Sequence, residues 1–207
     1  MINEKSMQDF LDELAGKAPT PGGGSAAAVM GAMGAALVSM VAHFTVGKKG
    51  YEAVEAEAAG LLQQAEALRR QLMDMVRADV DAFNQVMAAY GLARDTDARK
   101  AARSEAIQTA LKQATDVPLA CARLCAEVIR LTRPIAAIGN KNVISDAGVA
   151  VVAAEAALRS AALNVYVNIG AIKDEVYVAD RRQKLEQILA GSERLTEEVY
   201  ALVKSRL

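Results

Sequence analysis

The chain has no tryptophan, few aromatic residues, one histidine and only two cysteines. Aromatic side chains make up 4% of its 207 residues, and few segments are rich in the residue types that favour β-strands. Alanine, leucine, methionine and straight-chain charged residues are abundant instead, and these lose the least conformational freedom on entering a helix. The composition therefore favours helix almost throughout, in a single domain that covers residues 1–207.

An excess of charge of either sign is also absent. The 24 basic and 25 acidic residues leave a net charge of −1, so no basic surplus is available to bind nucleic acid or an acidic membrane surface. The first ten residues, MINEKSMQDF, contain acidic side chains and no apolar run, unlike a signal peptide. We expect a cytoplasmic protein without nucleic-acid or membrane partners.

Several catalytic and metal-binding patterns are missing as well. Cys121 and Cys125 lie one helical turn apart, but with a single histidine in the chain they lack the partners of a typical zinc site. Two free thiols in a reducing compartment are the expected state of these cysteines. No GxSxG motif is present, and the glycine run lacks the GKS/T ending of a phosphate-binding loop. The sequence therefore predicts no metal site.

The most informative segment present is TPGGGSAAAVMGAMGAALVSMVAHFTVGKK, residues 20–49. A proline and three glycines break the backbone, and we expect Ser25 to cap an apolar helix over about 25–46. Glycine allows a ligand to approach closely, and a helix N-terminus presents unpaired N–H groups and partial positive charge. This glycine loop is predicted to hold an anionic or acceptor-rich ligand. The apolar run is long enough to span a bilayer, but its small and polar residues favour the central helix of a soluble bundle.

Hydrophobic periodicity and turn signals predict the remaining elements. Pro118 is expected to kink or divide the fourth helix, and residues 134–142 are expected to form a loop before a helix capped by Ser145. The fold class is an all-α bundle of long antiparallel helices around a buried Ala/Gly-rich helix. Two helices that are apolar on all sides need more cover than one small bundle supplies, so we expect a two-fold homodimer. The helices expected besides 25–46 span about 6–15, 52–90, 96–132, 145–172 and 178–206.

Asp79 interrupts an apolar helical stripe. It lies four residues after Met75 and four before Phe83, whereas Asp81 lies on the opposite side, spaced to pair with Arg77 at the surface. An unpaired charge inside a bundle is costly, so an inward Asp79 needs a partner or a task. The partner is a helix N-terminus or an arginine, and the task is proton transfer by a partly desolvated carboxyl. The spacing alone leaves both interpretations open.

A second polar group follows in the sequence. Residues 139–142 read GNKN, and Ser145 and Asp146 come at a helix start, where the dipole favours a carboxylate. These residues either form a simple turn and cap or orient a ligand. Asn164 and Asn168, spaced i, i+4 on an apolar helix, either bond to backbone or line a polar pocket. Lys48 and Lys49 follow the apolar helix, where they stabilise its C-terminus or attract a ligand carboxylate.

Five motifs give this pattern a specific meaning. The segment TPGGGSAAA with a later GKK, then ADVDAF, DVPL, GNKNVISDAGVA and NVYVNI occur in this order. In this order they resemble the cyclodeaminase/cyclohydrolase family of folate enzymes. That family includes the C-terminal half of formimidoyltransferase-cyclodeaminase and stand-alone bacterial methenyltetrahydrofolate cyclohydrolases. The resemblance extends from about Phe10 to Leu202, although many members carry proline where this chain has Lys141.

The resemblance implies an all-helical homodimer that acts on a tetrahydrofolate derivative without a metal or redox cofactor. It implies that Asp79 is the catalytic acid and base. The implied activity is that of a methenyltetrahydrofolate cyclohydrolase, with formimidoyltetrahydrofolate cyclodeaminase as the alternative and a non-catalytic folate-binding dimer as a more distant one. Together with the residue arguments above, it selects as substrate-binding residues Pro21, Gly22, Gly23, Gly24, Ser25, Lys48, Asn140, Asn142, Ser145, Asp146 and Asn168.

Overall fold

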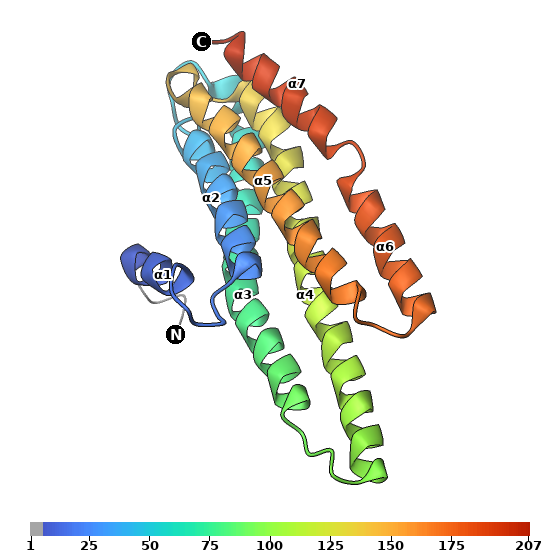
Figure 1. The fold of residues 1–207 in the computed structure, drawn as a ribbon. Coiled ribbons are helices and arrows are strands. Elements are labelled where there is room, and N and C mark those ends of the chain that lie inside the picture. The colour runs from blue at the N-terminus through green and yellow to red at the C-terminus, as the bar shows by residue number, and fades with distance from the viewer. Residues whose placement is uncertain (1–5) are drawn as a thin grey trace.

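The computed structural model describes residues 6–207, and all regular elements within this range are helical. Four long helices lie side by side, with one short helix standing apart from them and two further helices along the opposite flank (Figure 1). The predicted helical bundle is thus confirmed. The helices are α1 (Met7–Leu14), α2 (Gly23–His43), α3 (Glu55–Tyr90), α4 (Asp97–Ile138), α5 (Ile144–Ile169), α6 (Glu175–Leu189) and α7 (Ser192–Lys204), with short 3₁₀ turns at Glu52–Val54 and Lys141–Val143.

Small residues bring α2 close to its neighbours. A Cβ atom added to Gly34 would lie 3.0 Å from the carbonyl oxygen of Ala150 on α5, so the two backbones approach within the space that glycine leaves. On the side facing α3 and α4, a Cβ on Gly31 would lie 2.9 Å from the sulfur of Cys125 and 3.1 Å from Leu72. The alanine- and glycine-rich sequence of α2 therefore makes it the central helix, as predicted.

Two segments are long and apolar enough to cross a membrane by length and composition. They are Gly23–His43 and Lys141–Ile169, and 61% and 50% of their most apolar windows are buried inside the bundle. These segments contain the two helices α2 and α5, which pack against each other. Their apolar character is thus used largely in helix–helix packing, the role predicted for the first of them.

The path of α4 differs from the prediction. It continues through Pro118 and Pro134 to Ile138, so the predicted end near residue 132 and the loop over 134–142 were wrong. Proline removes the hydrogen bond that its N–H would give to the carbonyl four residues earlier, here that of Ala114. The side-chain amide of Asn168 on α5 donates to this carbonyl at 2.7 Å and replaces the missing donor. A tertiary contact therefore offsets the helix-breaking residue.

Three helix boundaries also need correction. Gly22 is the N-cap of α2, so Ser25 lies inside the first turn rather than at the cap. Val143 occupies the N-cap position of α5, so Ser145 is likewise inside its helix. The last predicted helix is two helices, because Gly191 adopts a φ of 78°, a left-handed conformation that favours glycine and breaks the chain between α6 and α7.

The contact between Asn168 and the Ala114 carbonyl predicts a thermodynamic coupling. Asn168→Ala leaves a buried carbonyl without its donor and should lower the free energy of unfolding by about 1–3 kcal/mol. In a Pro118→Ala background the backbone N–H of residue 118 can bond to the same carbonyl, so the loss should shrink. Denaturant unfolding of the wild type, both single variants and the double variant measures the coupling. Equal losses in both backgrounds would contradict the assignment.

Candidate active site

Asp79 on α3 points to the first turn of α2. The hydroxyl of Ser25 donates a hydrogen bond to Asp79 Oδ2 at 2.7 Å, and Ser25 itself is fully buried. Asp79 is half-buried, whereas Asp81 lies at the surface with Arg77, their closest charged atoms 3.6 Å apart. The two aspartates therefore have the separate environments that helical phase predicts. Asp79 has both a structural partner and access to the outside.

Glycine at position 24 makes room for this carboxylate. A Cβ atom on Gly24 would lie 2.1 Å from Asp79 Oδ1 and 2.6 Å from its Cγ, well inside van der Waals contact. The carboxylate thus occupies the space of the missing side chain, against the first turn of a helix where N–H groups lack intrahelical acceptors and the dipole is positive. We call residues 22–25 the glycine turn. It holds one oxygen of Asp79 through Ser25 and accommodates the other at Gly24.

A third helix contributes an amide to the same place. Asn164 on α5 lies beside Gly23, where an added Cβ would be 3.7 Å from Nδ2 and 3.8 Å from Oδ1 of the amide. The Nδ2 group donates to the carbonyl of Ser160 at 2.9 Å, which fixes the amide while leaving Oδ1 available as an acceptor. The spacing of Asn164 and Asn168 marked both amides. Only packing reveals that Asn164 faces the glycine turn, whereas Asn168 bonds to α4.

The second predicted group, which we call the amide loop (residues 139–146), is tied to the opposite end of α2. Asn140 is buried, and its side chain donates to the carbonyl of Phe44 at 2.7 Å while its backbone N–H donates to Thr45 Oγ1 at 2.9 Å. Its Oδ1 accepts from the N–H of Asn142 at 3.1 Å. Asn140 therefore shapes the loop, whereas Asn142 is exposed and Asp146 is half-buried.

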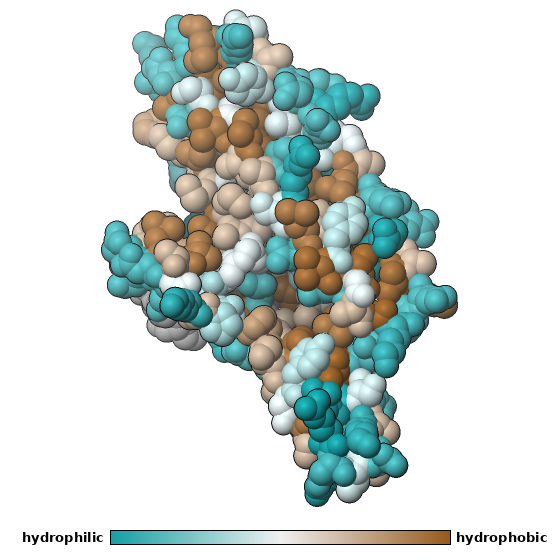
Figure 2. Space-filling view, viewed as in Figure 1, coloured by the Kyte–Doolittle hydropathy of each residue, from teal (hydrophilic) through white to brown (hydrophobic). Residues whose placement is uncertain are grey.

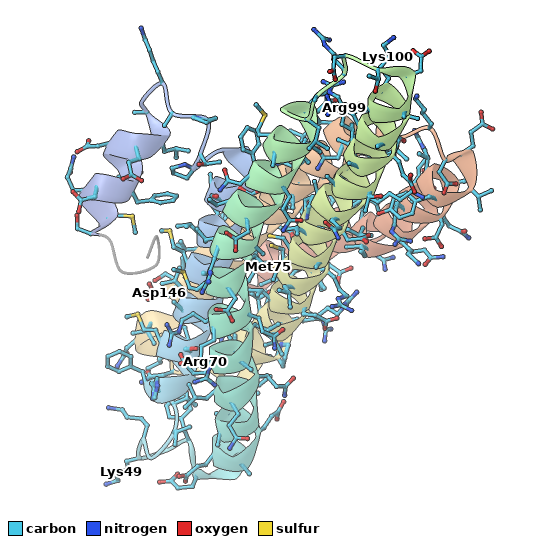
Figure 3. All side chains as sticks on the ribbon, turned by 90° about the horizontal axis from the view of Figure 1, so that it is seen from below. Lys49, Arg70, Met75, Arg99, Lys100 and Asp146 are labelled. Carbon is cyan, nitrogen blue, oxygen red and sulfur yellow. The ribbon has the colours of Figure 1, made fainter. Side chains whose placement is uncertain are left out.

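The predicted site residues fall into two clusters separated by the length of α2. Its 21 residues span about 30 Å, with the glycine turn at one end and the amide loop at the other. Lys48 lies with the amide loop, just beyond the end of α2, and is exposed. Figure 3 shows its neighbour Lys49 at the opposite end of the molecule from Arg99 and Lys100 in the first turn of α4. One subunit brings Pro21–Ser25 and Asp79 together but holds Lys48, Asn140, Asn142, Ser145 and Asp146 apart from them.

Comparison with known proteins shows to which family this chain belongs. Residues 6–187 match the family model described as formiminotransferase-cyclodeaminase. The chain belongs to this family. It is 56% identical over 207 residues to the methenyltetrahydrofolate cyclohydrolase of Methylorubrum extorquens, a match that covers the full length of both chains.

Other members of the formiminotransferase-cyclodeaminase family are more distant. The formimidoyltransferase-cyclodeaminase of Sus scrofa is 36% identical over 185 residues, which cover 89% of this chain but 34% of the pig protein. The crystal structure of the formiminotetrahydrofolate cyclodeaminase from Thermotoga maritima superimposes with a TM-score of 0.82 at 34% identity, covering 100% of this chain and 98% of the other. The resemblance predicted from the motifs is thus confirmed.

The glycine turn predicts contrasting effects of two neighbouring substitutions. Gly24→Ala places a methyl group where the Asp79 carboxylate lies, so the carboxylate must move and turnover should fall roughly 100-fold or more. Gly23→Ala meets only ordinary contacts with Asn164 and should keep most of the activity. Because alanine is the better helix former, neither variant should lose its helical circular dichroism. Equal activity of the two variants would show that the position of the carboxylate is unimportant.

Proposed function

We propose that this protein is a methenyltetrahydrofolate cyclohydrolase, which converts 5,10-methenyltetrahydrofolate and water into 10-formyltetrahydrofolate. The observation that carries the proposal is the carboxylate of Asp79 on the glycine turn, in a chain 56% identical over its whole length to a protein of that name. A carboxylate that accepts a hydrogen bond from the water molecule attacking the reacting carbon can act as general base and then as general acid. No metal or redox cofactor enters this chemistry.

The reaction divides into two proton transfers at Asp79. A water molecule attacks the methenyl carbon, and Asp79 takes one proton as the C–O bond forms and the positive charge of the substrate is lost. The bond from this carbon to N5 then breaks, Asp79 returns the proton to N5, and the hydroxyl proton leaves to solvent as the formyl C=O forms. One proton is released in total. The negative carboxylate beside the cationic methenyl group also stabilises the bound substrate electrostatically.

Formimidoyltetrahydrofolate cyclodeaminase activity is the second candidate. The fold similarity and 34% identity to the Thermotoga maritima cyclodeaminase favour it. In this reaction N10 attacks the formimidoyl carbon on N5 and ammonia leaves, so the same acid–base group would serve a related tetrahedral intermediate. Parallel assays with both folates, one following loss of the methenyl absorbance and the other following ammonia, distinguish the two activities. The match to the cyclohydrolase over the full chain places that activity first.

The assignment of Asp79 predicts a separation of turnover from binding. Asp79→Asn should lower kcat by about 10²–10⁴-fold, because the amide cannot carry the proton. Folate should still raise the thermal midpoint of the variant. Asp81→Asn changes the same residue type two positions along at the exposed surface and serves as the control. Unchanged turnover with Asp79→Asn would instead remove this residue from the mechanism, and binding without turnover in the wild type would favour a non-catalytic folate-binding protein.

Exposed apolar side chains support a two-fold homodimer. They are spaced by three, four, seven or eleven residues along α2 and α5, which are close to whole numbers of helical turns, so each helix carries one apolar stripe on its outer surface. Figure 2 shows apolar side chains gathered on the face where α2 and α5 lie in the view of Figure 1. Exposed apolar surface of this kind is typical of protein–protein contacts. Its members are Met33 and Met40 on α2, Phe44 at the C-cap of α2, and Val149, Val152, Leu163 and Val167 on α5.

Two-fold symmetry about the middle of α2 would unite the two clusters. Met33 is 53% exposed and lies at the midpoint between residues 23 and 43, the two ends of α2. If the α2 helices of two subunits are antiparallel around this point, the glycine turn of one lies beside the amide loop of the other. Each of the two sites would then combine Asp79 from one subunit with Lys48, Asn140, Asn142, Ser145 and Asp146 from the second.

The two buried free thiols, Cys121 and Cys125, suit a reducing compartment, and a cytoplasmic location is therefore part of the proposal.

A shared site predicts complementation between inactive subunits. Asp146→Asn should lower activity because its carboxylate orients the N–H groups of the pterin ring. When Asp79→Asn and Asp146→Asn subunits are mixed, unfolded and refolded together, each heterodimer regains one intact site, and about one quarter of the wild-type activity should return. Refolding each variant alone is the control. Activity of the mixture equal to the average of the two variants would contradict a site built from two subunits.

A further inference from the structure

A narrow slot between α1, α2 and α3 begins one helical turn from Asp79. Its volume is about 250 Å³. Val76 at one end precedes Asp79 by three residues on α3, and Val29 follows Ser25 by four residues on α2. Because α2 and α3 run antiparallel, the slot continues along both helices away from the glycine turn until it reaches Ala36 and Arg69. It is therefore a direct extension of the candidate active site.

The described walls of the slot are apolar apart from Ser6 and Arg69. Valine, alanine and methionine side chains of α2 and α3 form two sides, and α1 covers part of the third with Phe10 and Met7. Methionine and phenylalanine make favourable contacts with a flat aromatic ring, which a narrow slot accommodates edge-on or face-on. Among the described residues that line the slot, Arg69 is the only charged one: Ser6, Met7, Phe10, Val29, Ala32, Met33, Ala36, Arg69, Met73 and Val76.

Arg69 is fixed in place and retains capacity for a ligand. Its Nε and Nη2 groups donate to Glu66 at 3.1 and 2.7 Å, and its side chain is 40% exposed. The hydrogen bond from Arg69 lowers the pKa of Glu66 to about 2, so Glu66 remains ionised and keeps the guanidinium oriented. A guanidinium has five N–H groups, so those on Nη1 and the second on Nη2 remain for a further carboxylate.

We propose that this slot binds the aminobenzoyl-glutamate part of the folate substrate, with the aromatic ring between the apolar walls and a glutamate carboxylate on Arg69. The inference rests on the proposed function, in which the one-carbon bridge lies at Asp79. Ten residues of α3 separate Asp79 from Arg69, which corresponds to about 15 Å along the helix. An aromatic ring followed by one extended amino acid covers much of this distance, and the long arginine side chain covers the rest.

This placement assigns the glutamate tail to a residue that the sequence did not single out. Within one subunit Lys48, the predicted partner of the tail, lies beyond the far end of α2, and in the proposed dimer the Lys48 of the second subunit would lie past the glycine turn, away from the Arg69 end of the slot. With the tail directed along the slot, the pterin ring lies on the other side of the glycine turn. There Asn164 offers its Oδ1 atom as an acceptor. The folate would thus lie along the seam between α2 and α3, with its reacting carbon over Gly24 and Asp79.

Adjacent arginines allow a matched test. Arg69→Gln should raise the KM for 5,10-methenyltetrahydrofolate about tenfold or more and leave kcat within about twofold, because it removes a contact that is equal in ground and transition states. Arg70→Gln makes the same change of charge at an exposed residue that does not line the slot, and its KM should stay near the wild-type value. Arg69→Lys should restore part of the affinity. Equal KM values for Arg69→Gln and Arg70→Gln would overturn the proposal.

A fragment tests the slot without any turnover. 4-Aminobenzoyl-L-glutamate lacks the pterin and the reacting carbon, and calorimetry should show that it binds the wild type and Arg70→Gln but at least about tenfold more weakly to Arg69→Gln. 4-Aminobenzamide keeps the ring and its amide but carries no carboxylate, so it should not distinguish the three proteins. If the fragment shows this dependence but no folate is turned over, the slot stands and the proposed function fails. If folate is turned over but fragment binding ignores Arg69, the function stands and the slot assignment fails.

Discussion

The hydrogen bond from Ser25 to Asp79 is the interaction on which the account of this site depends. It links the first turn of α2 to α3 in a place where Gly24 leaves room for a carboxylate and for nothing larger. A carboxylate at a helix N-terminus is favourably placed by the helix dipole, and a buried hydroxyl fixes the orientation of one of its oxygens. The same contact therefore links two helices and fixes the carboxylate to which we assign the proton transfer.

The small residues of α2 serve the site as well as the core. Gly31 and Gly34 allow α3, α4 and α5 to approach one central helix, so side chains from α3 and α5 reach the same turn. The outer surface of α2 remains apolar and exposed, and its midpoint lies between the two clusters of predicted site residues. The proposed antiparallel dimer would account both for this apolar face and for the separation of the two clusters in one subunit.

The sequence pattern predicted those features of the structure that depend on residues close together in the chain. Helical phase placed Asp79 inward and Asp81 outward, and the alanine-rich run of α2 indicated a central helix. Of the two effects expected of Pro118, division of the helix was wrong, because Asn168, a residue 50 positions later in the chain, supplies the hydrogen bond that the proline removes. The roles of Asn164 and Arg69 depend on which neighbouring helix each side chain faces, and single-sequence spacing does not contain that information. The family motifs identified the substrate class, whereas the separation of their residues along α2 became visible only in three dimensions.

The central claim is that the one-carbon bridge of the folate reacts beside Asp79 on the glycine turn. A crystal structure of the Asp79→Asn protein with bound 5,10-methenyltetrahydrofolate tests it most directly, because the substitution slows turnover of the bound substrate. The account predicts the methenyl carbon within reach of position 79, directly or through one water molecule, and close to Gly24. A folate bound with its methenyl carbon distant from the glycine turn would contradict the account.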